Sequence, residues 1–280
     1  MARKRMRAGF QGERGAFSQV AVQQLLGPDA EAVPFQRFDQ VFSALSRSEV
    51  EAAVIPIENT LHGSVHENYD HLLHFELDIV AETNVRISHS LIAPPGVTFA
   101  RVKRVYSHPV ALNQCLQFFA ANPGIERVPF YDTAGSVKTI MEERPADAAA
   151  IASSVAAEIY GAKVLKRNLE DDPGNFTRFF LLRRPGHRTK QPVARLWKTS
   201  LVFSTRNVPG SLFRSLSAFA LRDIDLMKIE SRPLRGKPWE YLFYVDLIGR
   251  VDDPKVQKAL GHLAELADFL RVLGCYPKGA

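Results

Sequence analysis

Between residues 8 and 185, short apolar runs alternate with segments whose apolar residues recur every three or four positions. Runs such as residues 52–57 are typical of buried strands, and the recurring spacing is typical of amphipathic helices. One helix is predicted around Val41 and Phe42. Another is predicted after Pro109, with inner positions at Leu112, Cys115, Leu116 and Phe119. The repeated order of strand, loop and helix predicts an α/β unit with a mostly parallel sheet.

Two strand-like stretches, residues 78–83 and 84–93, interrupt this alternation before a Pro-Pro-Gly break. They predict a crossover between two smaller sheets, so the unit is expected to have two lobes with a cleft between them. Residues 175–182 are expected to return to the first lobe, at the hinge of that cleft. We assign residues 8–185 to this unit and the polar, proline-bearing residues 186–197 to a linker.

The last part of the chain, residues 198–277, has a different order of elements. Its pattern predicts strand, helix, strand, strand, helix and strand, which is the ferredoxin-like βαββαβ order. A small sheet of this kind, with helices on one face, commonly pairs with a copy of itself. A homodimer or homotetramer is therefore expected.

Three loops of small residues precede helices in the first unit, at residues 12–18, 58–64 and 132–136. Backbone N–H groups and the helix dipole favour anions at such positions. The strand at residues 52–57 is expected to stop at its proline and to deliver Glu58, Asn59 and Thr60 to the carboxyl end of the sheet, where α/β proteins bind ligands. Thr60 or Ser64 is expected to cap the helix that follows.

Thr177 and Arg178 stand where the turn at residues 171–174 meets an apolar strand. Such a junction is held rigidly and faces a cleft. The loops add the hydroxyls of Ser18, Thr60 and Thr133 and the amide of Asn59. This set suits a small, multiply anionic carboxylate, because arginine pairs with carboxylates bidentately. It offers no strong base or redox group.

Composition narrows the class of partner. The 280 residues are 46% hydrophobic and carry a formal charge of +6, but Arg3, Lys4, Arg5 and Arg7 supply four of these charges at one end. Without them the chain is nearly balanced, so nucleic acid is not an expected partner. No apolar run reaches the ~18 residues of a membrane span, and no signal-peptide pattern follows the basic segment. No membrane partner and a cytoplasmic location are expected.

Several kinds of catalytic or metal site are not indicated. Cys115 and Cys275 lie far apart and belong to no metal-spaced set, so both are expected to be small core residues of a cytosolic protein. His71 and His74 share a predicted helix face, but no third ligand accompanies them. Thr177 has no histidine beside it in sequence, and no phosphate-binding loop motif is present. No metal or cofactor is expected.

Five motifs in a fixed order resemble those of the prephenate dehydratase family. They are Gly12-x-x-Gly15-x-Phe17-Ser18, Pro56-Ile57-Glu58-Asn59, Ser107-His108-Pro109, Asp132-Thr133-Ala134-Gly135 and Asn175-x-Thr177-Arg178-Phe179. The βαββαβ part, with Glu230-Ser231-Arg232-Pro233, is similar to that family's ACT regulatory domain. The resemblance covers essentially the whole chain after the basic segment.

The resemblance implies a two-lobed fold like that of periplasmic binding proteins and the cofactor-free conversion of prephenate to phenylpyruvate in phenylalanine biosynthesis. It implies that Thr177 protonates the departing hydroxyl. Glu58 is the next candidate for a second acid. Arg178 is expected to hold the side-chain carboxylate of prephenate, with the ring carboxylate near Phe179. The implied substrate-binding residues are Ser18, Asn59, Thr60, His89, Thr133, Ala134, Arg178 and Phe179. Those implied for L-phenylalanine are Asn207, Gly210, Ser211, Leu212, Glu230, Ser231, Arg232 and Pro233.

Some positions depart from the family pattern, and other functions remain open. Thr60 replaces a usual serine, His62 stands where glycine is frequent, and Ser211 replaces a usual alanine. Arogenate dehydratase, whose substrate carries an amino group in place of the keto group, is the alternative enzyme. An amino-acid-sensing binding protein without catalysis is the alternative outside enzymes.

Overall fold

The computed structural model describes residues 5–187, 196–234, 236–237 and 239–279. The predicted linker at residues 186–197 lies largely outside the described residues. The chain forms two compact units, one of Met1–Phe75 with Thr83–Leu181 and the other of Glu76–Glu82 with Leu182–Ala280. Among the described residues, no helix combines the length and the apolar character needed to cross a membrane.

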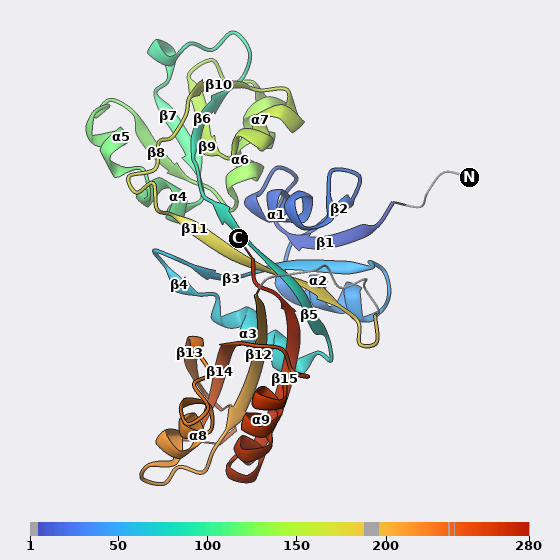
Figure 1. The fold of residues 1–280 in the computed structure, drawn as a ribbon. Helices are drawn as coiled ribbons and strands as arrows, with labels where there is room; N and C mark the ends of the chain where they lie inside the picture. The colour runs from blue at the N-terminus through green and yellow to red at the C-terminus, as the bar shows by residue number, and fades with distance from the viewer. Residues whose placement is uncertain (1–4, 188–195, 235, 238, 280) are drawn as a thin grey trace. The chain divides into compact units, whose positions relative to one another are not determined.

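The first lobe of the first unit is built on a sheet that contains β1, β2, β3, β5 and β11, with the short β4 paired antiparallel to β3 (Figure 1). β1 pairs in parallel with β2 on one side and with β3 on the other, and the order continues from β3 to β11 and β5. The inner residues Ala8, Phe10 and Val54 are fully buried. The elements are β1 (Arg7–Gln11), α1 (Phe17–Leu26), β2 (Glu31–Phe35), α2 (Phe38–Ser46), β3 (Ala52–Asn59), β4 (Gly63–Ser64), α3 (His66–His74), β5 (Asp78–Arg86) and β11 (Phe176–Arg183).

The second lobe has its own sheet of order β10-β6-β9-β7-β8. The central strand β9 is buried at all five positions, which fits a strand covered on both faces. Its elements are β6 (Ser90–Ala93), the 3₁₀ helix η1 (Phe99–Arg101), β7 (Arg104–Ser107), α4 (Pro109–Asn113), α5 (Leu116–Ala120), β8 (Glu126–Pro129), α6 (Thr133–Glu143), β9 (Ala148–Ala152), α7 (Ser154–Tyr160) and β10 (Lys163–Lys166).

Two crossovers join the lobes, as the strand pattern predicts. The chain leaves the first sheet after β5 and returns to it in β11 (Figure 1). The crossovers bind each other, because Ile87 N–H donates to Asn175 O at 2.8 Å and Leu169 N–H donates to His89 O at 2.9 Å. The hinge therefore consists of two backbone segments that are hydrogen-bonded side by side.

The lobes also approach each other closely at Gly15. This residue has φ +89°, and a Cβ placed on it would lie 2.6 Å from Ala156 Cα on α7. Ser153 Oγ donates to Gly15 O at 2.6 Å. The glycine is required here by both its backbone conformation and the lack of space.

The structure corrects several expected elements of the first lobe. β3 does not stop at Pro56 but continues to Asn59, and the Pro56 carbonyl accepts from Asn68 Nδ2 at 2.7 Å. Neither Thr60 nor Ser64 caps α3, whose N-cap is Val65. Strands β1 and β2 were not predicted as strands, since β1 is followed at once by the glycine-rich loop and β2 contains Pro34.

The single helix expected after Pro109 is two short helices. α4 ends at Asn113, and α5 begins at Leu116 because the Asp171 carboxylate accepts the N–H groups of Leu116 and Gln117 at 2.7 and 2.9 Å. Leu116, expected to point inward, is 47% exposed. The break frees Gln114 from the helix and turns its side chain to other partners.

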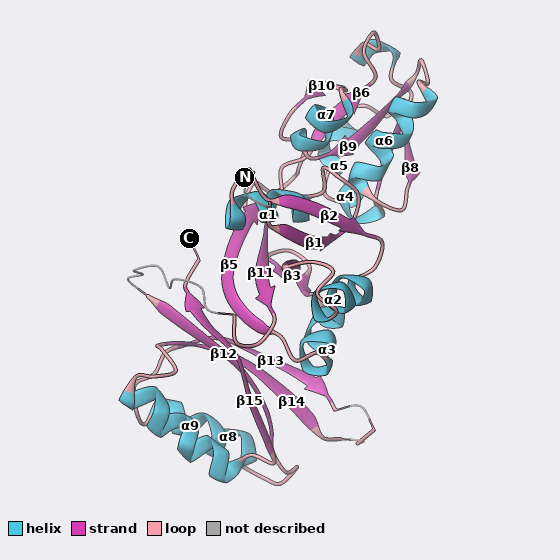
Figure 2. Cartoon of the chain, turned by 90° about the vertical axis from the view of Figure 1, so that its right-hand side faces the viewer, coloured by secondary structure: helices cyan, strands magenta, loops and turns pink. Residues whose placement is uncertain are grey.

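The second unit has the predicted βαββαβ order. Its antiparallel sheet has the order β13-β14-β12-β15, with the start of β5 beside β15, and α8 and α9 lie on the same face (Figure 2). Its core includes the fully buried Phe203, Phe219 and Leu263. The elements are β12 (Trp197–Ser204), α8 (Ser211–Ala220), β13 (Leu226–Pro233), β14 (Tyr241–Ile248), α9 (Pro254–Leu266) and β15 (Phe269–Pro277).

A buried ionic cluster lies within this second unit. Lys198 Nζ is 3.0 Å from Glu82 Oε2 and 3.9 Å from Asp246 Oδ2. All three side chains are less than one-tenth exposed. Ser200 donates to Asp246 and lies 2.7 Å from the Tyr276 hydroxyl. The ion pair of Glu82 with Lys198 joins the first part of β5 to β12. Removing one of the two charged side chains would leave the other charge buried without its partner, which is costly.

Candidate active site

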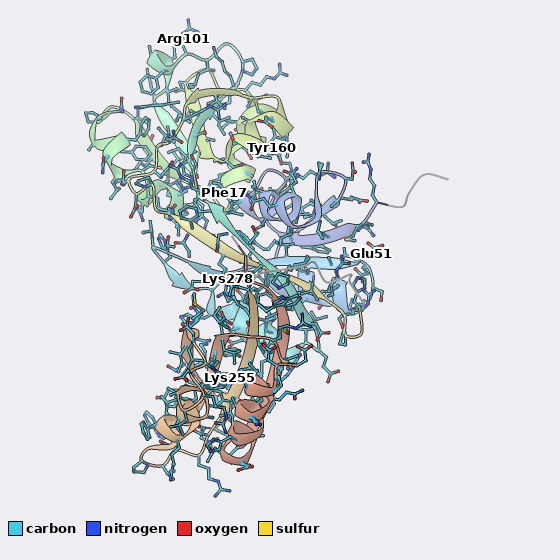
Figure 3. All side chains as sticks on the ribbon, viewed as in Figure 1. Phe17, Glu51, Arg101, Tyr160, Lys255 and Lys278 are labelled. Carbon is cyan, nitrogen blue, oxygen red and sulfur yellow. The ribbon has the colours of Figure 1, made fainter. Side chains whose placement is uncertain are left out.

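A cavity of about 300 Å³ opens between the two lobes of the first unit. The first lobe supplies side chains at the ends of β3 and β11, and the second lobe supplies side chains from α4 and the start of α6. Phe17, labelled in Figure 3, begins α1 and adds an aromatic ring to the wall. The lining residues are Phe17, Pro56, Asn59, His62, Val65, Ile87, His89, His108, Val110, Ala111, Gln114, Thr133 and Thr177.

Asn59 holds Thr177 in place at the centre of the first lobe's wall. Its Nδ2 group donates to Thr177 Oγ1 at 3.0 Å, to Asn175 Oδ1 at 2.8 Å and to Phe176 O at 3.0 Å. Its Oδ1 accepts the N–H groups of Leu61 and His62, each at 3.0 Å. Because every partner fits one orientation of the amide, Thr177 Oγ1 is an acceptor toward Asn59.

Thr60 has a structural position in this loop. Its hydroxyl donates to Gly174 O at 2.9 Å and accepts from Phe176 N–H at 3.0 Å. It therefore joins the end of β3 to the turn before β11 and stands beside the cavity lining. A serine would supply the same hydroxyl, which accounts for the exchange at this position.

Arg178 and Glu58 lie on the other face of the sheet from Thr177 and Asn59. Side chains alternate between faces along a strand, so the neighbours of two cavity residues point away from the cavity. Arg178 Nη1 is 3.8 Å from Glu58 Oε2, and the guanidinium stacks over the Phe180 ring at 4.7 Å. Within the described part of the chain, neither Arg178 nor Glu58 is among the lining residues.

Three other predicted residues are buried and are not among the lining residues. Phe179 is 2% exposed, Ser18 is 8% exposed and Ala134 is fully buried. Ser18 follows Phe17 in α1, and Ala134 follows Thr133 in α6. In this structure, therefore, the lining contains Asn59, His89, Thr133 and Thr177 of the residues expected to act on substrate.

His89 lies in the first crossover and is 1% exposed. Its Nε2 is 2.8 Å from Gln114 Oε1, its backbone N–H donates to Glu170 Oε2 at 2.8 Å, and its ring meets Phe17 edge-on at 5.7 Å. Burial lowers the pKa of the imidazole, which outweighs the bond to Gln114 and the charge of Glu170. The ring is therefore neutral near pH 7, and its buried Nδ1 has no partner in the described structure.

His62 and Gln114 meet across the cavity. Gln114 Nε2 is 3.3 Å from His62 Nδ1, which is also 3.2 Å from Asn59 Oδ1. Gln114 was missed as a site residue, because the helical periodicity placed it inside a continuous helix. His108, which was noted only as part of a motif, also lines the cavity and caps α4 through its Nδ1.

Thr133 stands at the first turn of α6, an 11-residue helix whose N-terminus faces the cavity wall. The preceding Asp132 caps this helix by accepting Gly135 N–H at 2.8 Å. Burial raises the pKa of the Asp132 carboxyl, and the two backbone N–H bonds that it accepts offset part of this effect. Among the described residues, no group of histidines, cysteines and carboxylates has the arrangement of a metal site.

A family model described as prephenate dehydratase matches residues 8–187, and one described as ACT domain matches residues 199–265. The chain belongs to the prephenate dehydratase family. The predicted fold class is thereby confirmed: a two-lobed, periplasmic-binding-protein-like α/β domain is followed by a ferredoxin-like ACT domain.

Relatives of known name agree with this membership. A protein of Arabidopsis thaliana named arogenate dehydratase/prephenate dehydratase 2, chloroplastic, is 46% identical over 98% of this chain and 73% of its own length. The crystal structure of prephenate dehydratase in complex with L-Phe from Arthrobacter aurescens has 32% identity and a TM-score of 0.88, covering 98% of this chain and 90% of that one. This member of the prephenate dehydratase family is therefore an enzyme.

Another solved structure resembles the chain as strongly but is described differently. It is described as GqqA, a novel type of quorum quenching acylases. It has 32% identity and a TM-score of 0.88, and it covers 97% of each chain.

In the ACT domain of this chain, the residues expected to bind L-phenylalanine lie on two separate sets of elements. Ser211 lines a cavity of about 400 Å³ that includes Arg206, Arg214 and Asp268, and Asn207, Gly210 and Leu212 belong to the same loop and helix start. Glu230, Ser231, Arg232 and Pro233 lie on β13, which β14 separates from β12. The two groups therefore lie on different elements of the ACT domain.

Proposed function

We propose that this chain converts prephenate to phenylpyruvate by decarboxylating dehydration, with Thr177 as the hydrogen donor to the departing hydroxyl. The observation that carries the proposal is the orientation of the Thr177 hydroxyl. Its oxygen accepts from Asn59, and no acceptor in the described structure takes its hydrogen. A hydroxyl has one hydrogen to donate, so Thr177 can direct it to a ligand in the cavity.

The reaction needs little more than this donor. The bond from the ring to its carboxylate breaks, carbon dioxide leaves, and the electron pair moves through the ring as the bond to the hydroxyl breaks. The leaving oxygen takes the Thr177 hydrogen to become water, and Thr177 regains a hydrogen from solvent. Aromatisation supplies the driving force, and a hydrogen bond that strengthens as the hydroxyl departs lowers the barrier.

The wall of the cavity also fits this reaction. Phe17, Ile87 and Val110 present apolar surface, where a carboxylate about to become carbon dioxide is not stabilised in its ground state. We place the ring carboxylate against this surface, since Phe179 is buried in the core. The side-chain carboxylate then lies toward the polar side of the cavity, with Arg178 able to reach it only by leaving Glu58.

Prephenate fits better than arogenate as the substrate. The described lining residues include neither aspartate nor glutamate, so the ammonium group of arogenate would find no carboxylate there. Prephenate carries a keto group at that position and needs no such partner. Arogenate remains the alternative substrate, because the Arabidopsis relative is named for both reactions.

We propose that residues 8–185 form the catalytic domain and residues 198–277 an ACT domain that inhibits it when L-phenylalanine binds. The Arthrobacter relative was solved with L-Phe, which supports this ligand class. β13 is an edge strand with Met227 and Ile229 each 46% exposed. A second copy paired on this edge would cover them. A homodimer or homotetramer and a cytoplasmic location are kept as predictions.

The other candidate functions have less support. An acylase that uses a hydroxyl nucleophile needs a base beside it. In the described structure the hydroxyls of Thr60 and Thr177 bond to backbone groups and an amide, and neither bonds to an imidazole. A sensor without catalysis does not agree with relatives that are named as dehydratases.

A turnover assay tests the proposal. Purified protein is incubated with prephenate or with arogenate, phenylpyruvate and phenylalanine are measured, and both assays are repeated with added L-phenylalanine. Thr177→Val keeps the shape of the side chain but removes the hydroxyl, and it should lower kcat by roughly 10²–10⁴. Thr177→Ser should retain most activity. The absence of product from either substrate, or full activity of Thr177→Val, would contradict the proposal.

A further inference from the structure

Two neighbouring strands, β5 and β11, each belong partly to both compact units. In β5, residues 78–82 belong to the second unit and residues 83–86 to the first. In β11, residues 176–181 belong to the first unit and residues 182–183 to the second. The two strands are adjacent in the order of one sheet, and each continues across the boundary without a break. We call residues 78–86 and 176–183 together the shared ribbon.

The second unit holds the first part of β5 in three places. Gly274 of β15 pairs with Ile79, and a Cβ at position 274 would overlap the Ile79 carbonyl, so the strands approach this closely only because the residue is glycine. The Glu82 carboxylate forms the buried ion pair with Lys198 at 3.0 Å. Its other oxygen accepts Gly279 N–H at 3.0 Å. The start of β5 is therefore fixed to β15, to β12 and to the residues that follow β15.

The other end of the shared ribbon lies at the hinge of the first unit. Arg86, the last residue of β5, pairs with Glu170 of the second crossover at 3.2 Å. Ile87 follows β5 and donates its N–H to the carbonyl of Asn175, which precedes β11, at 2.8 Å. Ile87 and Thr177 both line the cavity. A shift of the ribbon along its length would therefore move two parts of the cavity wall.

Paired strands pass on a displacement that a loop would absorb. An extended strand has little capacity to lengthen, because each residue already spans about 3.3 Å. The two strands also resist sliding past each other, since a slip of one residue would turn every side chain to the opposite face of the sheet. A change in how residues 78–82 are held should therefore reach residues 83–86 and their partners in β11.

We propose that the shared ribbon is the route by which L-phenylalanine bound to the ACT domain changes the position of Ile87 and Thr177 in the cavity. The proposal rests on the proposed function, in which L-phenylalanine inhibits the dehydration. It gives a regulatory role to Gly274 and Glu82, which belong to the lining of neither the cavity between the lobes nor the one beside Ser211. Weakening the hold on β5 should reduce the coupling between the two sites and leave each site intact.

Two substitutions weaken this hold at independent places. Gly274→Ala forces β15 away from Ile79, and Glu82→Gln removes the charge that faces Lys198 but keeps an oxygen for Gly279 N–H. In both variants, kcat without L-phenylalanine and the Kd for L-phenylalanine should stay within about threefold of the wild type, because the first unit keeps its own contacts to the ribbon. Saturating L-phenylalanine should lower kcat by about tenfold or more in the wild type and by less than about threefold in each variant.

Each variant has a matched control in the second unit. Gly261→Ala adds the same methyl group on α9, where it meets open space, and Asp252→Asn removes a carboxylate from an exposed pair with Arg250. Both controls should keep the wild-type inhibition. Thermal unfolding gives the folded fraction of every variant, and kcat is expressed per folded protein. Wild-type inhibition in Gly274→Ala or in Glu82→Gln, or loss of inhibition in a control, would overturn the proposal.

A second measurement needs no turnover. Hydrogen exchange of the backbone amides is followed by mass spectrometry with and without saturating L-phenylalanine. In the wild type, L-phenylalanine should change the exchange rates of residues 83–89 and 175–181 by about threefold or more, and Gly274→Ala should lack this change. Unchanged rates in the wild type, or the same change in Gly274→Ala, would overturn the proposal. A protein with the expected change but no activity on prephenate or arogenate would refute the proposed function and leave the coupling standing.

Discussion

Replacing Asn59 with aspartate tests the geometry around Thr177 most directly. The variant keeps the size and shape of the side chain but exchanges two N–H donors for a carboxylate oxygen. In the wild type this group faces Asn175 Oδ1 at 2.8 Å, Phe176 O at 3.0 Å and Thr177 Oγ1 at 3.0 Å. In the variant Thr177 can satisfy the carboxylate only by donating its own hydrogen, which is then lost to the substrate.

The structure sets the expected magnitudes. Two N–H donors, shared among three acceptors and worth roughly 1 kcal/mol each, are lost, so the free energy of unfolding should fall by about 2 kcal/mol. For a unit of this size that corresponds to a Tm lower by about 4–8 °C. Because the proposed donor is redirected, kcat should fall by about 10²–10⁴, as for removal of a general acid.

The loss of stability in Asn59→Asp should change with pH in one direction. Three acceptors face one oxygen of the new carboxyl, while the N–H groups of Leu61 and His62 still donate to the other oxygen and offset part of their effect. We expect the acceptors to outweigh the two donors, so that the folded pKa is raised above the unfolded value of about 3.9. The folded variant then binds a proton more tightly than the unfolded chain does. The loss of stability is therefore largest above the folded pKa and shrinks as pH falls through it, because the protonated acid can donate again.

The assay compares Tm between pH 4 and 8 and kcat at pH 7.5 for the wild type, Asn59→Asp and a control. Asn122→Asp is matched, since Asn122 Nδ2 donates to Phe118 O at 2.7 Å in the second lobe, outside the cavity lining. The control should lose stability but keep the kcat of folded protein. A kcat for Asn59→Asp within about threefold of the wild type would refute the assignment of Thr177 as donor.

Two further predictions concern the free energy of unfolding. Glu82→Gln removes the carboxylate 3.0 Å from Lys198 Nζ and keeps that of Asp246 at 3.9 Å, so unfolding by urea should show a free energy lower by about 3–5 kcal/mol. Asp39→Asn, at the exposed pair with Arg37, should lower it by less than about 1 kcal/mol, and equal small losses for the two variants would contradict the role of burial. Asp132→Asn keeps an oxygen that accepts Gly135 N–H but removes a carboxyl whose pKa is raised by burial. The stability that this carboxyl contributes to the wild type is fully present below about pH 3.9 and is lost as pH rises through the raised pKa. The variant should therefore gain stability relative to the wild type from pH 4 to 7, and a difference in Tm between the two that does not change with pH would refute this argument.

Much of the fold could be predicted because it follows from local patterns. The crossover between lobes was visible as consecutive strand-like stretches ending in a Pro-Pro-Gly break, and the βαββαβ order was visible in the spacing of apolar residues. Local patterns also placed Asn59 and Thr177 each at the end of a strand, since each stands where a polar segment meets a buried strand; it is the fold that brings the two together. These signals depend on neighbouring residues alone.

The errors in the predicted elements depend on contacts that are distant in sequence. The break before Leu116 depends on the Asp171 carboxylate, which lies 55 residues away, so periodicity could not show it. The same break directs Gln114 to the cavity. Arg178 was grouped with Thr177 because they are adjacent in sequence, although alternation along a strand places adjacent side chains on opposite faces. The expected contact of Arg178 with the side-chain carboxylate stays a prediction.

An alcohol is a weak acid in solution, so the position of Thr177 has to compensate for its chemistry. The Asn59 N–H bond to Thr177 Oγ1 polarises the hydroxyl, and hydrogen bonds in a chain strengthen one another in a low-dielectric site. The same bond fixes the direction of the remaining hydrogen before substrate binds, so no reorganisation is needed as the hydroxyl departs. Asn59 is held in turn by Asn175 and the backbone of the hinge. The catalytic power of Thr177 is therefore a property of the hinge that orients it, and variants that loosen the hinge should lower kcat even where they touch no substrate atom.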